Sequence, residues 1–182
     1  MQQHFATFEQ PLIYTPGDND WTDCHRANNG GYDPLERLAT VRRMFFRDEF
    51  SLGRTRLPVL RQSADPRFAR FVENARWVHN NVMFVTLHVI GSTNNLQRNR
   101  AAIEEYLERN EANLAWLRAA FAEAQTQNRA AVVVAMQADM DFDHVPDRRP
   151  GFNDTIAALQ DGTIAFGRPV LLIHGDSHYF RV

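Results

Sequence analysis

The chain has 182 residues, with 20 basic residues against 22 acidic ones, and every basic residue is an arginine. Without lysine it can form no Schiff base and has no P-loop lysine for a nucleoside triphosphate. A hydrophobic content of 44% supplies a sizeable core and excludes disordered and collagen-like classes. The net charge of −2 excludes the basic field that nucleic-acid binding requires. We therefore expect a small-molecule partner.

Cysteine content and apolar run length bear on the compartment. Cys24 is the only cysteine, so an internal disulfide is excluded. The longest apolar runs, such as residues 130–136, are far shorter than the roughly 20 residues of a membrane span. Residues 1–10 show neither a basic cluster nor a long apolar stretch, so no signal peptide is visible. These features predict a cytoplasmic chain with no membrane partner. We find no repeat or linker and expect one domain over residues 1–182.

The first third of the chain predicts a strand, a loop and a helix. Residues 11–15 form a short apolar run that ends at Pro16 and Gly17, which is typical of a buried strand followed by a turn. A polar loop rich in Asp, Asn and Gly occupies residues 18–33. Pro34 then suits the first turn of a helix, and apolar residues recur at helical spacing to about Phe46. Residues 48–75 show no clear pattern.

The rest of the chain alternates strands and helices. Residues 82–90, 130–136 and 169–173 are continuous apolar runs that predict buried strands. Between the first two of these runs, apolar residues from Ile103 to Phe121 recur at intervals of three, four and seven residues, which predicts a long helix. On its solvated side we expect the following charged residues to face one another: Glu104, Glu105, Glu108, Arg109 and Arg118. The alternation predicts an α/β fold with a sheet covered on both faces.

Three polar clusters directly follow predicted strands, at residues 17–20, 137–139 and 174–178. In α/β sheets, binding sites form beyond the carboxyl ends of the strands, so the three clusters are expected to converge. The alternative is ordinary turn chemistry, because Asp, Asn and Gly are common in turns. The third cluster offers two histidines and an aspartate on one short loop, which suits a metal. We expect Asp176 and His178 to point to the site and His174 to be a core histidine.

Two other patterns are candidate sites. Residues 139–143 begin like a calcium-binding loop, but His144 stands where that loop needs Gly and Pro150 stands where it needs Glu. We therefore expect a solvated loop. The alternative is that Asp139 contacts the site. Residues 175–178 contain the letters of a serine esterase block, and Asp141 and His144 have the spacing of its orienter and base. The order along the chain is wrong for that family, which makes Ser177 the weaker alternative.

Four segments resemble a bacterial subgroup of the calcineurin-like metallophosphoesterases. They are residues 14–26 (Tyr-Thr-Pro-Gly-Asp-Asn-Asp-Trp-Thr-Asp-Cys-His-Arg), 84–95 (Phe-Val-Thr-Leu-His-Val-Ile-Gly-Ser-Thr-Asn-Asn), 115–118 and 169–181, in family order and spacing. The resemblance implies an α/β/β/α sandwich. It also implies a site for two divalent metal ions that hydrolyses phosphate mono- or diesters, in which a metal-bound hydroxide attacks in line.

The family motifs can be carried over position by position. Asp18 stands where the family has a metal-ligating Asn, and Asn19 stands where it has the His that acts as the acid. Gln137 and Asp176 stand where the family has metal-ligating His residues. His178 matches a family metal ligand. The resemblance thus implies Asp18, Asn19 and His178 as catalytic residues and Asp18, Gln137, Asp176 and His178 as metal ligands. Oxygen in place of nitrogen favours Mg²⁺, Mn²⁺, Ca²⁺ or Fe over zinc.

The first two family motifs have no counterpart, so the chain resembles the carboxyl-terminal two-thirds of the domain, without its first strand-helix-strand. The resemblance then implies a phosphoester hydrolase of impaired activity, or a vestigial phosphoesterase fold that acts as a binding or assembly module. A missing central strand would expose a sheet edge and apolar surface, which favours self-association. If an upstream segment has been lost, the protein belongs in the periplasm or outside the cell instead of the cytoplasm.

Overall fold

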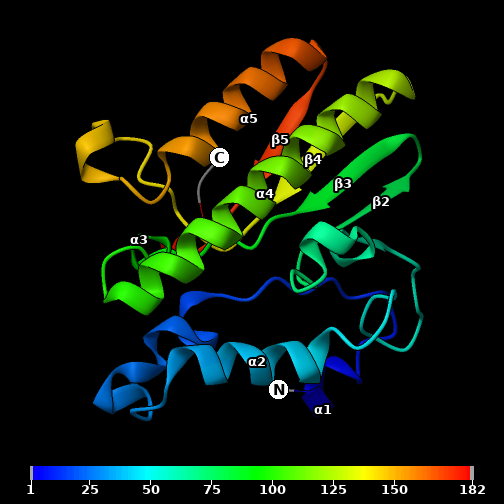
Figure 1. Ribbon diagram of the computed structural model, residues 1–182. Coiled ribbons are helices and arrows are strands. Elements are labelled where there is room, and N and C mark those ends of the chain that lie inside the picture. Colours follow the sequence, from blue (N-terminus) through cyan, green and yellow to red (C-terminus); the bar gives the residue numbers. More distant parts are fainter. Residues whose placement is uncertain (1, 181–182) are drawn as a thin grey trace.

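The computed structural model describes residues 2–180 and shows an α/β protein with one five-stranded mixed sheet (Figure 1). The strand order is β1-β2-β3-β4-β5. The antiparallel part consists of β1 (Leu60–Arg61), β2 (Ala75–His79) and β3 (Val82–Thr86). The strands β4 (Ala131–Ala135) and β5 (Val170–Ile173) continue it in parallel with β3. The α/β class and the last three predicted strands are thus confirmed.

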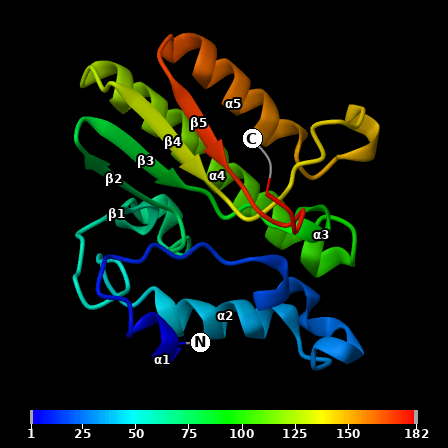
Figure 2. The same cartoon turned by 180° about the vertical axis from the view of Figure 1, so that it is seen from behind.

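Two helices cover one face of the sheet. They are α4 (Arg100–Thr126), which connects β3 to β4, and α5 (Asn153–Phe166), which connects β4 to β5. Both lie on the same side of the strands, as Figures 1 and 2 show from opposite directions. When successive parallel strands are added to a sheet in the same direction, right-handed crossovers place the connecting helices on the same face. The main core lies between these layers and includes Met83, Val85, Val132, Val134, Leu117, Phe121 and Leu159.

The opposite face of the sheet is only partly covered, which differs from the expectation of helices on both faces. Trp77, Phe84, Val133 and Leu171 are direct cross-strand partners and form one row across β2 to β5. Trp77 and Phe84 stack with their ring centroids 5.2 Å apart. Towards the edge strand, Leu171 is 54% exposed and Ile173 is 51% exposed. The apolar run in β5 therefore does not reflect burial on two faces.

The N-terminal third forms a layer below the sheet (Figure 2). It contains α1 (Gln2–Phe5) and α2 (Pro34–Phe45), and the Asp33 carboxylate caps α2 by accepting a hydrogen bond from the Glu36 N–H. The predicted helix is confirmed. The strand predicted over residues 11–15 is wrong, because only an isolated bridge joins Leu12 to Leu52. Tyr14 in this segment instead packs among aromatic rings of Phe5, Phe45 and Phe46.

The charged face expected on the long helix is partly wrong. Glu104 and Glu108 are exposed, but Glu105 and Arg109 are buried. Arg109 pairs with Glu105 at 2.7 Å and lies against residues 88–95, while Leu107 at 57% exposure faces solvent. The i, i+4 spacing of Glu105 and Arg109 is the same on a buried face as on a surface, so sequence spacing could not distinguish the two.

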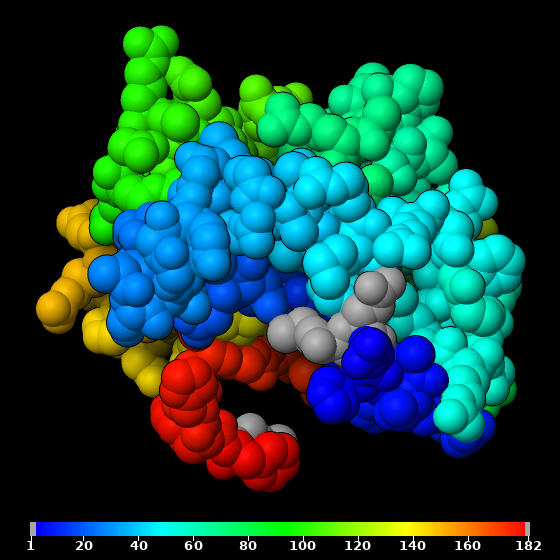
Figure 3. All heavy atoms as spheres, turned by 90° about the horizontal axis from the view of Figure 1, so that it is seen from below, coloured from blue at the N-terminus to red at the C-terminus, as the bar shows by residue number. Residues whose placement is uncertain are grey.

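Within residues 2–180, none of the helices combines the length and apolar character required to cross a membrane. After β5 the chain runs away from the sheet. Figure 3 shows this C-terminal end, in red, projecting from the molecule. Its last described residues, Tyr179 and Phe180, are both exposed.

Candidate functional site

The three polar clusters meet at the carboxyl ends of the parallel strands. Gln137 follows β4 and Asp176 follows β5, while Asp18 lies in the short 3₁₀ helix η1 (Asp18–Asp20). Gln137 Nε2 donates hydrogen bonds to Asp176 Oδ1 at 2.9 Å and to Asp18 Oδ1 at 3.3 Å. The convergence predicted from the sequence is therefore present for these three residues. Asp18 reaches it on an irregular segment and not at the end of a strand.

Gly91 forms the floor of this site. Its N–H donates to Gln137 Oε1 at 2.7 Å. A Cβ atom at Gly91 would clash with Oδ2 of both Asp18 and Asp176, each under 3.0 Å away. The two carboxylates thus point their Oδ2 atoms at the same place over a residue that has no side chain. This close approach requires glycine at position 91.

The site is negatively charged, and its carboxylates are partly shielded from water. Burial raises the pKa of Asp176, and the nearby Asp18 carboxylate raises it further. The hydrogen bond from Gln137 and the charge of His178 act in the opposite direction. His178 is itself exposed and makes no hydrogen bond in the described part of the chain. A divalent cation between the two carboxylates would remove the repulsion that raises the pKa of Asp176.

The two carboxylates suit a metal ion better than Gln137 does. Their oxygens are ligands of hard cations, and they converge on the space that a Cβ of Gly91 would fill. Gln137 presents its amide nitrogen to both carboxylates and its oxygen to the Gly91 N–H. For Gln137 to serve as a ligand, its amide would have to turn. Among residues 2–180, no group of three or more His, Cys, Asp or Glu side chains is arranged to hold a metal.

Asn19 and His178 lie at the rim. Asn19 is exposed, and its backbone N–H donates to Asp18 Oδ1 at 2.8 Å, so it fixes the orientation of that carboxylate. Asp176 and His178 both have left-handed backbone conformations, with φ of 69° and 60°. This tight turn brings both side chains to the end of the sheet within three residues.

A left-handed turn completes the site, and sequence reasoning missed it. Residues Ser92, Thr93, Asn94 and Asn95 have φ values of 51°, 53°, 54° and 67°. Asparagine adopts this conformation readily, but threonine does so at a cost of roughly 1–2 kcal/mol. The Ser92 hydroxyl donates to Asp23 Oδ1 at 2.8 Å and approaches Asp18 Oδ2 at 3.4 Å. The only signal in the sequence is the pair of asparagines.

A basic pocket adjoins the carboxylates through Ser92. It has a volume of about 290 Å³ and is lined by Thr22, Asp23, His25, Arg26, Ser92, Thr93, Asn95, Gln97 and Arg98. Arg26 pairs with Asp23 at 2.7 Å and donates to the Ser92 hydroxyl at 3.3 Å. Arg98 donates to the Thr22 carbonyl at 2.8 Å. Two arginines beside a pair of carboxylates suit an anionic group held next to a cation.

The alternative sites receive no support from the geometry. In the described chain, no hydrogen bond joins the Ser177 hydroxyl to a histidine. Asp141 and His144 lie 3.7 Å apart on an exposed loop. His174 was expected to be a satisfied core histidine, but its buried Nδ1 has no partner among residues 2–180. The ring of His174 lies 6.0 Å from that of Phe142.

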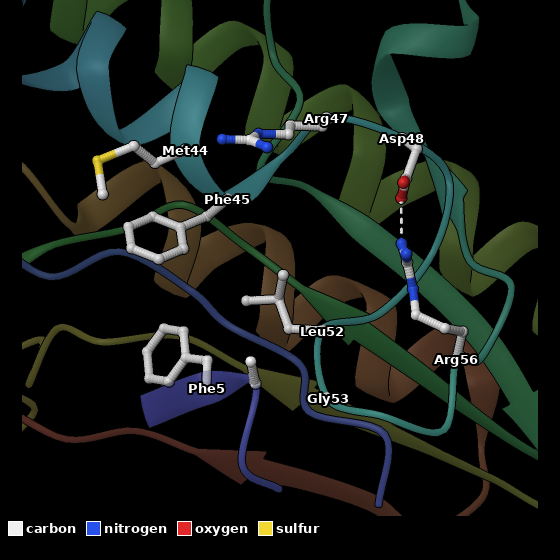
Figure 4. A pocket seen from close by; sticks show the side chains of 9 residues that line it. Phe5, Met44, Phe45, Arg47, Asp48, Leu52, Gly53 and Arg56 are labelled. Carbon is white, nitrogen blue, oxygen red and sulfur yellow. Dashed lines mark hydrogen bonds and ion pairs between the residues drawn. The ribbon is translucent and has the colours of Figure 1, made fainter. Parts of the chain in front are cut away.

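A separate hollow of about 210 Å³ lies between α1 and α2 (Figure 4). Phe5, Met44, Phe45 and Leu52 supply its apolar walls. At its rim Asp48 and Arg56 form an ion pair at 2.6 Å. It includes none of the site residues predicted from the sequence.

No protein-family model, characterised protein or solved structure matches this chain. The resemblance to calcineurin-like metallophosphoesterases therefore rests on the four segments quoted above, and the function has to be argued from the site.

Proposed function

We propose that this protein is a metal-dependent phosphoester hydrolase of the calcineurin-like α/β/β/α type with impaired activity. The observation that carries the proposal is the convergence of the Asp18 and Asp176 carboxylates over Gly91, next to the arginine-lined pocket. Asp18, Gln137, Asp176 and His178 would form the ligand set, with the Gln137 amide turned so that its oxygen faces the ion. For the compartment, we propose the cytoplasm.

A bound divalent ion supplies Lewis-acid polarisation of the phosphoester and a water of lowered pKa. The chain's own residues supply the rest. Arg26 and Arg98 bind the phosphate oxygens with charge-assisted hydrogen bonds, and Ser92 connects that pocket to Asp18. Asn19 stands at the rim where an acid would act, but an amide cannot donate a proton as an imidazolium does. Substrates with poor leaving groups should therefore react slowly.

The test is hydrolysis of 4-nitrophenyl phosphate and bis(4-nitrophenyl) phosphate, whose leaving group needs no acid. We expect slow turnover, well below about 1 s⁻¹, that requires added Mn²⁺ and stops with chelator. Asp176→Asn should lower the rate at least about tenfold, and Arg98→Gln should raise KM, because each removes a charge the site uses. Ser177→Ala serves as the control and should leave the rate unchanged. Turnover that resists chelator and depends on Ser177 would contradict the proposal.

A second candidate function is a binding or assembly module. It is favoured by the row of Trp77, Phe84, Val133 and Leu171 on the partly covered face of the sheet. Leu171 and Ile173 lie on the edge strand β5, whose outer side has no partner strand in the described chain. An exposed apolar face next to an open edge favours association with a second copy of the chain. Hydrolysis and assembly are separable, because these residues do not overlap with the carboxylate site.

A further inference from the structure

A cavity of about 340 Å³ lies on the helix-covered side of the sheet, between the edge strand β1, the adjacent strand β2 and the middle of α4. Its walls are largely apolar and include Leu60, Phe68, Ala115, Trp116 and Ala119. Its charged side chains are Arg61, Asp65, Arg67 and Arg76. It shares no residue with the carboxylate site or with the basic pocket beside it. The volume falls at the lower end of the range for small-molecule sites.

Two side chains of this cavity have buried N–H groups without acceptors. Trp116 is only 6% exposed, and its Nε1 has no hydrogen-bond partner among the described residues. Arg76 Nε and Nη1 are likewise buried and unpartnered. The guanidinium of Arg76 lies 4.3 Å from the centre of the Trp116 ring, and its Nη2 pairs with Glu123 at 2.6 Å. Buried N–H groups are nearly always paired in folded proteins, so this group of donors points to a ligand.

The other polar side chains in the cavity are already engaged. Arg61 donates to three backbone carbonyls, those of Asp48, Phe50 and Val72. Gln62 donates to the Ala112 carbonyl, and Arg67 pairs with Asp65 at 2.6 Å. Among the described lining residues, only Arg76 and Trp116 therefore have buried nitrogens without a hydrogen-bond partner.

The charge around the cavity favours an anion. All three hydrogen-bond partners of Arg61 are neutral, so no carboxylate pairs with it directly, although the charges of Asp48 and Glu73 act on it from further away. Burial lowers the pKa of both Arg61 and Arg76, because desolvation disfavours the charged form of each. An anionic acceptor would offset this loss of hydration, whereas a cationic ligand would add to the repulsion.

We propose that this cavity binds a small carboxylate with an aromatic or aliphatic body. The carboxylate accepts hydrogen bonds from Arg76 and from the Trp116 Nε1–H, and the planar guanidinium suits a carboxylate. The apolar body of the ligand packs against Leu60, Phe68 and Ala119. Because the Arg76 nitrogens and Trp116 Nε1 are shielded from solvent, both side chains turn about their torsions to meet the ligand, with no change in the backbone. The proposal is independent of the hydrolase function.

The test uses the indole N–H signals of the tryptophans in a ¹H–¹⁵N correlation spectrum of the full chain. The sequence has three tryptophans, Trp21, Trp77 and Trp116, so Trp→Phe variants assign each signal. Titration with phenylacetate should shift the Trp116 signal downfield and leave the Trp21 signal in place, with a Kd on the order of 1 mM. Phenylacetamide, which lacks the charge, should bind at least about fivefold more weakly. Equal binding of the two compounds, or no shift of Trp116, would overturn the proposal.

Three variants sharpen the test. Arg76→Gln should abolish the phenylacetate shift. Glu123→Gln, at a partly exposed side chain, frees Arg76 and should tighten phenylacetate binding severalfold without affecting phenylacetamide. The matched control is Arg70→Gln, which also breaks an arginine–glutamate pair, at a 53% exposed side chain outside the cavity, and should leave binding unchanged. If Arg76→Gln does not fold, Glu123→Gln still tests the proposal. Unchanged or weaker phenylacetate binding in Glu123→Gln would contradict the role assigned to Arg76.

Discussion

The Arg109 side chain binds both the side chain and the backbone carbonyl of Asn94. The guanidinium donates to Asn94 Oδ1 at 2.6 Å and to the Asn94 carbonyl at 3.0 Å. The remaining N–H groups of Arg109 donate to Glu105 and to the His88 carbonyl. One fully buried side chain on α4 thus fixes a turn of residues 92–95 whose left-handed conformation is intrinsically unfavourable. The shape of the candidate site depends on this residue, which does not line the site.

Arg109→Met should destabilise the fold by about 3–5 kcal/mol, because it leaves the Glu105 carboxylate buried without its partner. Urea denaturation followed by circular dichroism measures the free energy of unfolding. Arg100→Met is the matched control, since Arg100 pairs with Glu104 at the same i, i+4 spacing but is 93% exposed. That variant should lose less than about 0.5 kcal/mol. Similar losses in the two variants would show that the Arg109 network adds little.

Gly91→Ala should disrupt the arrangement of the two carboxylates, because the new methyl group occupies the place where their oxygens meet. We expect a loss of stability of about 1–3 kcal/mol and of any Mn²⁺ binding measured by calorimetry. Gly175→Ala in the adjacent loop is the control, as its Cβ would meet only the Gln137 carbonyl at 3.4 Å. Wild-type Mn²⁺ affinity in Gly91→Ala would rule out metal binding between Asp18 and Asp176.

Stability of the metal-free protein should depend on the protonation of Asp176. Its pKa is raised on folding, so the native state binds this proton more tightly than the unfolded chain does. The stabilisation is complete below the unfolded pKa of about 3.9 and is lost as the pH rises through the folded pKa. Asp176→Asn should therefore raise the melting temperature at neutral pH with chelator present, and this gain should vanish at the acid end.

Added Mn²⁺ tests whether the effect of Asp176→Asn on the melting temperature comes from the charge of the Asp176 carboxylate. The ion should raise the melting temperature of the wild type far more than that of Asp176→Asn, because the variant keeps only the Asp18 carboxylate to attract the cation. An Asp176→Asn variant that melts lower than the wild type at neutral pH would mean that the repulsion from Asp18 is outweighed by another contact of Asp176.

The partly covered sheet face makes self-association testable. We expect sedimentation velocity to show a dimer that dissociates on dilution, and Leu171→Glu to shift it to monomer, because a charge at the centre of a buried apolar interface is costly. Leu107→Glu on α4 is the matched control, since Leu107 is 57% exposed and Leu171 is 54% exposed. A wild type that is monomeric at every concentration, or equal effects of both variants, would exclude this face as an interface.

Local pattern determined much of the secondary structure. The helices α2 and α4 follow from apolar spacing, with Pro34 marking the start of the first, and the three parallel strands follow from continuous apolar runs. The meeting of Gln137 and Asp176 was also predictable, because parallel strands end at a common edge, whereas Asp18 reaches this edge on an irregular segment. Each of these inferences depends on neighbours within a few residues or on one general rule of sheet topology.

Tertiary structure alone decided the rest. Apolar periodicity does not say which sheet face a helix will cover, so Leu171 was expected inside and is exposed. The spacing of Glu105 and Arg109 is the same on a surface and in a core, and only the packing of α4 against residues 88–95 determines that this pair is buried. The cavity at Arg76 and Trp116 joins residues 40 positions apart in sequence. Such contacts depend on how the layers are placed, and the sequence encodes that placement only through the packing of the whole chain.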